Sequence, residues 1–232
     1  MARGWAHRCP IPVRAPKVAR DFIPYIYSTP ELQGLLQAIT PERTKGLSPG
    51  TMRTLLLLLY GAGLRLSEAL KLEETDVDLT ECLLHVRCSK FFKSRLVPIG
   101  PKLAQVLRDY ASERSAGDGA NRRFLRAQQG TPVSVATAER VFRTLRLAAQ
   151  VHRTDGARYQ PRLHDLRHTM ATHCLIRGYR QGADVSSLLV NLSAYLGHVD
   201  ITGTQKYLTL TADLRQEAST RFAHYALGGC HE

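Results

Sequence analysis

Residues 48–68 read SPGTMRTLLLLLYGAGLRLSE, and this stretch decides much of the fold. Its opening Ser-Pro pair is typical of a helix start. The five leucines at 55–59 form the apolar body of that helix, and Gly61 and Gly63 predict its end. A membrane-spanning helix needs about 20 apolar residues. The run is far shorter, so it predicts a buried helix of a globular protein.

Arg65 follows directly where this apolar helix breaks. A position of that kind can direct a long side chain into a cleft. Glu68 comes three residues later, so its carboxylate can hold the guanidinium of Arg65 in place. On this stretch alone, an exposed Arg–Glu pair is an equally good interpretation.

Working outward, further helices and one hairpin are predicted. Thr29-Pro30-Glu31 is typical of a helix start with Thr29 as the cap, and the residues that follow place Leu32, Leu35, Leu36 and Ile39 on one face. Two β-prone runs at 82–87 and 94–99 predict a hairpin, with Pro98 favouring an edge strand. The other predicted helices cover 102–110, 135–149, 163–177 (stopped by Gly178), 186–196, 202–208 and 212–225. The fold class is therefore α+β, predominantly helical with a small antiparallel sheet.

The composition describes a globular, strongly basic chain. Of 232 residues, 44% are hydrophobic and 22% charged, which excludes wholesale disorder. The formal net charge of +12 favours a polyanionic partner, and nucleic acid comes before an acidic membrane. The N-terminus lacks the apolar segment of a signal peptide, and the five cysteines have no paired spacing. We expect reduced thiols and a cytoplasmic, DNA-associated protein.

Two segments concentrate the positive charge. Residues 140–180 hold nine arginines against two acids, and Arg140, Arg143 and Arg146 fall on the side of helix 135–149 that we expect to be exposed. We interpret these three as DNA-binding residues. Residues 1–20 contain basic residues and no acid, which indicates a flexible basic tail. That tail could lie on phosphates or be a disordered leader.

His164 and Arg167 lie three residues apart in His-Asp-Leu-Arg-His, so a helix would bring them to one face. An imidazole beside a guanidinium suits a phosphate, although such a pair is often merely solvated. His164, together with His168, His173 and Cys174, could also suggest zinc. No second ligand pair of the CxxC type accompanies them, so no metal is predicted.

Three further residues indicate a function only when they are considered as a set. Lys90 lies in the expected hairpin turn, His198 follows Leu-Gly, and Tyr207 comes nine residues later. In this order and with these flanks, the set resembles the tyrosine recombinases, also called the phage integrase family. The matching phrases are Tyr60–Leu70 (YGAGLRLSEAL), Lys93–Gly100 (KSRLVPIG), His164–Thr172 (HDLRHTMAT) and Leu196–His198 (LGH) ahead of Tyr207. The resemblance covers roughly residues 22–225 and implies a tyrosine recombinase catalytic-domain fold.

The resemblance implies a role for each of these residues. Arg65 and Arg167 would clamp the scissile DNA phosphate and stabilise the charge of the pentavalent transition state. Glu68 would hold the side chain of Arg65 in the orientation that phosphate binding requires.

Tyr207 would attack phosphorus and form a 3′-phosphotyrosine. Because a phenol has a pKa of about 10, it needs a base or a strong positive field. His164 is the candidate base, and His198 would donate a hydrogen bond to a non-bridging oxygen. Lys90 is the candidate general acid; Lys93 is its rival and otherwise a DNA-binding residue.

The resemblance also sets expectations for domains and partners. Residues 1–20 would be the tail and 21–232 the catalytic domain, without the N-terminal core-binding domain usual in the family. We therefore expect weak, salt-sensitive binding of double-stranded DNA by this chain alone.

Within a DNA synapse we expect a homo-tetramer, with or without partner recombinases. No cofactor is expected, because the arginines and the lysine supply the charge that a metal would bring. The function implied is site-specific recombination for a mobile genetic element. The alternatives are a DNA-binding accessory protein of the same fold and a topoisomerase of related mechanism.

Overall fold

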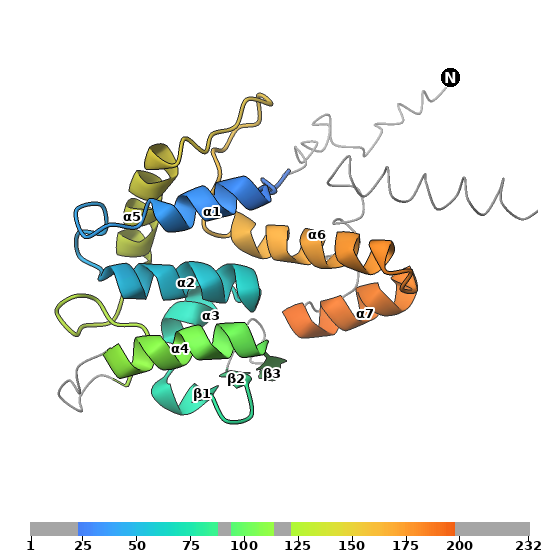
Figure 1. Cartoon of the computed structure of the whole chain (residues 1–232), viewed down its shortest axis with the longest axis horizontal. Helices are drawn as coiled ribbons and strands as arrows, with labels where there is room; N and C mark the ends of the chain where they lie inside the picture. Colours follow the sequence, from blue (N-terminus) through green and yellow to red (C-terminus); the bar gives the residue numbers. More distant parts are fainter. Residues whose placement is uncertain (1–22, 88–93, 114–121, 198–232) are drawn as a thin grey trace, which may run out of the picture.

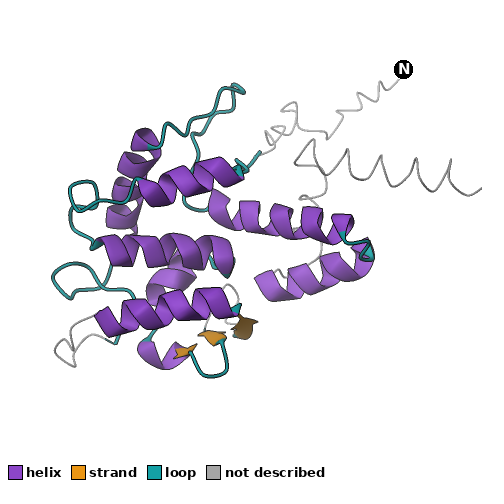
Figure 2. Cartoon of the chain, in the orientation of Figure 1, coloured by secondary structure: helices purple, strands orange, loops and turns teal. Residues whose placement is uncertain are grey.

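The structure is a computed structural model, and it describes residues 23–87, 94–113 and 122–197. Helices dominate it, with three short strands gathered at one end (Figures 1 and 2). In chain order the elements are α1 (Thr29–Gln37), α2 (Pro49–Gly61), α3 (Leu66–Lys71), the 3-10 helix η1 (Glu74–Asp76), β1 (Val77–Asp78), β2 (Leu83–Val86), β3 (Arg95–Pro98), α4 (Pro101–Glu113), α5 (Val135–Ala148), α6 (Asp165–Arg180) and α7 (Val185–Leu196). The α+β class predicted from the sequence is confirmed.

Helix α2 is the central element of the core. Its start at Ser48-Pro49 is as predicted, because the Ser48 hydroxyl accepts a hydrogen bond from the Thr51 N–H (3.0 Å). Leu55, Leu58 and Leu59 have no exposed surface. The helix packs against both α4 and α6, so the leucine run is buried on more than one side.

The predicted hairpin is present as β2 and β3, paired antiparallel with Leu84 opposite Val97. The strand order β1-β2-β3 places β3 and its Pro98 at an edge, as expected for a residue without an N–H. Strand β1 was not predicted, because two residues carry no readable alternation. The hairpin turn, residues 88–93, lies outside the described residues.

Two predicted boundaries were wrong. Ser28, one residue before the expected cap, caps α1 and forms a reciprocal capping box with Glu31. Gly178 does not stop α6, which continues to Arg180. A Cβ at Gly178 would lie 2.3 Å from Leu188 Cδ2, so this glycine lets α6 and α7 approach closely instead of ending the helix.

Helices α6 and α7 form a pair with its own small core, which includes Met170, Leu175 and Leu196. Figure 1 shows the pair projecting beside α2 and α4. Leu163, just before α6, and Leu166, in its first turn, are buried in the main core. In the described part of the chain, no helix is long and apolar enough to cross a membrane. The predicted helices 202–208 and 212–225 lie outside the described residues.

Candidate functional site

The turn between α2 and α3 positions Arg65 and Glu68. Gly63 has a φ of +60°, a conformation that favours glycine, and Arg65 is the N-cap of α3. The Glu68 carboxylate accepts hydrogen bonds from the Arg65 backbone N–H (2.9 Å) and from Arg65 Nη1 (2.7 Å). The two residues predicted to interact therefore do so, through both main chain and side chain.

Arg95, at the start of β3, makes the other strong contacts with Glu68. Its Nη1 and Nη2 donate to the two carboxylate oxygens at 3.0 and 2.9 Å, a bidentate arrangement. Burial alone would raise the pKa of Glu68, but the hydrogen bonds from Arg95 and Arg65 lower it to about 2. Arg95 lies within the phrase KSRLVPIG, and its place in that phrase is the one signal in the sequence that points to it.

Arg167 approaches the same carboxylate from α6. Its side chain is only 2% exposed, and its Nη1 lies 3.9 Å from Glu68 Oε2. Nη1 also donates to the Gly63 carbonyl (2.5 Å), and Nη2 donates to the Leu196 carbonyl (2.5 Å). The structure thus brings the guanidinium groups of Arg65 and Arg167, which are far apart in the sequence, to one buried carboxylate.

His164 precedes α6 as its N-cap residue but makes no side-chain cap. Part of the residue is exposed to solvent, and its ring meets that of His168 edge-on, with the ring centroids 4.9 Å apart. Desolvation by the surrounding protein, followed by the charge of Arg167, lowers the pKa of His164 below its usual 6.5. The ring is therefore neutral at pH 7 and able to accept a proton.

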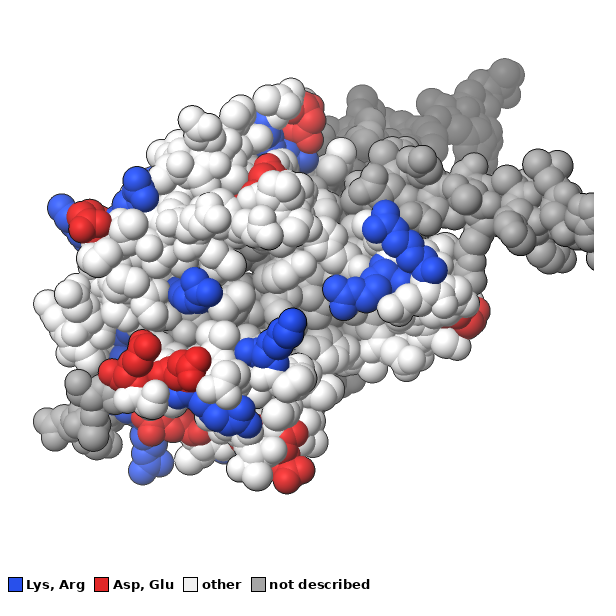
Figure 3. Space-filling view, in the orientation of Figure 1, with Lys and Arg blue, Asp and Glu red and all other residues white. Residues whose placement is uncertain are grey.

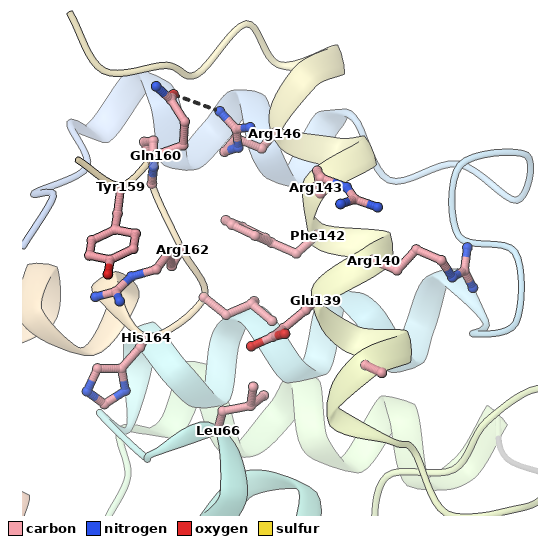
Figure 4. Close-up of a pocket in the computed structure, with 13 residues that line it drawn as sticks. Leu66, Glu139, Arg140, Phe142, Arg143, Arg146, Tyr159, Gln160, Arg162 and His164 are labelled. Atoms are coloured by element: carbon pink, nitrogen blue, oxygen red, sulfur yellow. Dashed lines mark hydrogen bonds between the residues drawn. The ribbon is translucent and has the colours of Figure 1, made fainter. Parts of the chain in front are cut away.

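A pocket of about 550 Å³ lies between α5 and the loop that leads to α6 (Figure 4). Figure 4 shows Arg140 and Arg143 on α5, and Tyr159 and Arg162 on the facing loop. Leu66, which follows Arg65, and His164 also line the pocket. The pocket therefore reaches His164 and the residue next to Arg65.

The expectation that Arg146 is exposed was wrong. Its residue exposure is 9%, and its Nη1 donates to the Val151 carbonyl (3.0 Å) and to Gln160 Oε1 (3.2 Å), the bond drawn in Figure 4. The loop after α5 folds back over Arg146, which the helical spacing could not indicate. Arg140 and Arg143 are exposed as expected.

On the face that Figure 3 shows, the basic residues do not form one uniform surface. On the face in Figure 3, blue side chains stand in separate groups, one of them toward the α6–α7 side, and acidic side chains lie among those at the opposite end.

Four of the predicted site residues lie outside the described residues: Lys90, Lys93, His198 and Tyr207. Gly197, the residue directly before His198, is described, and its carbonyl accepts a hydrogen bond from Arg65 Nη2 (3.1 Å). Within the described residues, no group of three or more His, Cys, Asp and Glu side chains could hold a metal ion. His173, one member of the group considered for zinc, instead shares a hydrogen bond with the Tyr60 hydroxyl (3.0 Å).

Comparison with known proteins gives a consistent result. Residues 29–213 match the phage integrase family. "Putative integrase/recombinase y4rB" of Sinorhizobium fredii is 41% identical over 215 residues, which cover 89% of this chain and 67% of that protein. Tyrosine recombinase XerA of Thermococcus kodakarensis is 32% identical over 209 residues, which cover 90% of this chain and 66% of that protein.

Among solved structures, the Tn1549 transposon integrase (residues 82–397) in complex with circular intermediate DNA has a TM-score of 0.61 at 19% identity, over 86% of this chain and 67% of that one. This likeness concerns the fold alone. The chain spans about two thirds of the length of the two relatives named above. The match over residues 29–213 and the 41% identity, on top of the shared fold, make the chain a member of the phage integrase family.

Proposed function

We propose that this chain cleaves and rejoins DNA strands through Tyr207, with a 3′-phosphotyrosine intermediate, in site-specific recombination for a mobile genetic element. The observation that carries the proposal is the convergence of Arg65 and Arg167 on the Glu68 carboxylate, with Nη1 distances of 2.7 and 3.9 Å. Family membership and the fold shared with a transposon integrase add support.

In the proposed reaction, the Tyr207 oxygen forms a bond to phosphorus while the bond from phosphorus to the 5′-oxygen breaks. His164 takes the phenolic proton, and its lowered pKa keeps the ring neutral at pH 7 and ready for that proton. Lys90 gives a proton to the leaving 5′-oxygen. Rejoining reverses these steps, and the phosphotyrosine conserves the bond energy, so no cofactor is required.

The two arginines stabilise the charge that develops on the non-bridging oxygens. The side chain of Arg65 is 23% exposed, so part of it is accessible to a phosphate. Glu68 holds Arg65 in a fixed position, so the site is organised before the substrate arrives. His198 contributes a hydrogen bond to a non-bridging oxygen.

The proposed partner is double-stranded DNA, contacted by Arg140 and Arg143 among other basic residues. The net charge of +12 supports this, as does the DNA in the transposon integrase structure. A homo-tetramer within a DNA synapse, with or without partner recombinases, and a cytoplasmic location complete the proposal. Binding should weaken steeply as salt rises, because each phosphate contact releases counterions.

The test uses a pool of short duplexes with one central nick and randomised arms, at low salt. When a strand is cleaved close to the nick, the short fragment between the cleavage point and the nick is released and cannot rejoin. The covalent protein–DNA adduct therefore accumulates, and it survives denaturant. Wild type should form this adduct and Tyr207→Phe should not. Tyr159→Phe, which alters an exposed tyrosine of the pocket, is the matched control and should react normally.

Three outcomes would overturn parts of the proposal. An unchanged adduct yield in Tyr207→Phe would remove the nucleophile assignment. DNA retention without any adduct would favour the accessory binding protein. Relaxation of a supercoiled plasmid that carries no recombination site would favour the topoisomerase.

A further inference from the structure

Three consecutive carbonyl groups at the end of α7 are each held by a different arginine. Arg95 Nε donates to the Tyr195 carbonyl (3.0 Å). Arg167 Nη2 donates to the Leu196 carbonyl (2.5 Å), and Arg65 Nη2 donates to the Gly197 carbonyl (3.1 Å). The same three guanidinium groups also surround the Glu68 carboxylate. One acidic side chain and one helix end therefore fix all three arginines.

The physical reason is the chemistry of a helix C-terminus. The last four carbonyls of a helix lack partners within it, and the helix dipole places partial negative charge there. Gly197 adopts a left-handed conformation with a φ of +66°, and a Cβ at this position would lie 3.0 Å from Arg95 Nη1. The glycine therefore both ends α7 and leaves room for the Arg95 guanidinium.

Arg95 differs from the other two arginines in how it meets Glu68. Its guanidinium donates to both carboxylate oxygens, whereas Arg65 Nη1 donates to one of them and Arg167 Nη1 lies 3.9 Å from the other. Arg95 Nε also donates to a main-chain carbonyl. Arg95 is the first residue of β3. It lies two residues after the end of the hairpin turn, residues 88–93, which contains Lys90. Arg95 thus connects the hairpin, the acid that supports Arg65 and the end of α7.

We propose that Arg95 is a positioning residue for strand cleavage: it orients Glu68, and through it Arg65, and it ties the hairpin to the end of α7. This inference rests on the proposed function. Arg95 acts through other residues and does not itself contact the DNA. A lysine cannot replace it, because a single ammonium group cannot donate to both carboxylate oxygens in parallel and to the Tyr195 carbonyl as well.

The prediction separates catalysis from binding. With DNA at saturation, the single-turnover rate of adduct formation on the nicked duplexes should fall in Arg95→Lys and Arg95→Gln, by about 10- to 100-fold. Binding of the same duplexes, measured by fluorescence anisotropy, should stay within about threefold. The matched control is Arg87→Lys, at the other end of the hairpin, where Arg87 is exposed and pairs with Asp76; it should react like wild type.

A double-mutant cycle tests the route through Glu68. If Arg95 acts through that carboxylate, then Arg95→Gln combined with Glu68→Gln should be little slower than the slower single variant. Losses that multiply would overturn this route.

The remaining outcomes are distinguishable. Wild-type rates in Arg95→Lys would overturn the inference and leave the proposed function intact. The inference would also be overturned if the rate and the DNA affinity fell by the same factor and the thermal unfolding midpoint fell as well. Arg95 would then only stabilise the fold. Absence of adduct in wild type would overturn the proposed function itself.

Discussion

Gly63→Ala should both destabilise the fold and disturb the candidate functional site. Gly63 has a φ of +60°, and its carbonyl accepts a hydrogen bond from Arg167 Nη1. An alanine Cβ would lie 2.4 Å from Met170 Cε and 3.1 Å from Leu196 Cδ2. The substitution therefore adds a strained backbone conformation to a steric conflict with α6 and α7.

The cost can be worked from these two sources. A non-glycine residue in the left-handed region costs about 1–2 kcal/mol. Overpacking a filled core costs typically about 1–3 kcal/mol, and the terminal methyl group of Met170 can give way in part. The sum is about 2–5 kcal/mol. For a chain of this size it corresponds to a fall in the unfolding midpoint of roughly 4–20 °C.

Thermal unfolding followed by circular dichroism measures the shift. Gly156→Ala is the matched control, because Gly156 also has a positive φ (+71°) but a Cβ there would meet nothing within 4 Å. Only the backbone cost, about 1–2 kcal/mol, should then remain. In Gly63→Ala combined with Met170→Ala, the loss should be smaller than the sum of the single losses. Equal shifts for Gly63→Ala and Gly156→Ala would refute the steric reasoning.

Three further predictions follow from the described contacts. Gly178→Ala should lower the free energy of unfolding by about 1 kcal/mol, because contact with Leu188 outweighs the helix-propensity gain; stabilisation in a denaturant titration would contradict this. The lowered pKa of Glu68 (about 2) means that its stabilising contribution is complete above pH 4.5 and is lost as pH falls toward 2. Glu68→Gln should therefore flatten the acid loss of stability over this range. The lowered pKa of His164 predicts that the acid limb of the adduct-rate profile lies below pH 6.5, and a midpoint above that value would count against His164 as the base.

The parts of the fold that sequence reasoning predicted are those governed by local rules. Ser48 and Pro49 begin α2 because a cap and a proline act within one turn, and the hairpin follows from alternation inside two short runs. Gly178 illustrates the limit. Glycine is a common helix stop, but here the packing of α7 against α6 overrides that local preference.

The same distinction applies to the candidate site. The contact between Arg65 and Glu68 was predictable because the two residues lie one helical turn apart. Arg95 reaches Glu68 from a strand 27 residues away, and Arg146 is buried by a loop that follows its helix. No spacing rule reports such contacts, because they depend on how separate elements pack.

The arrangement of the arginines carries a consequence for how the proposed reaction is organised. Arg167 is held between the carbonyls of Gly63 and Leu196, so its position depends on the α2–α3 turn and on the end of α7 together. The carbonyls of residues 195–197 that accept from the three arginines come directly before His198 in the sequence and ten residues before Tyr207. A shift of the end of α7 would therefore alter the positions of all three arginines at the same time. Arg65, Arg95 and Arg167 share this one support, so their geometries are coupled through the main chain of α7.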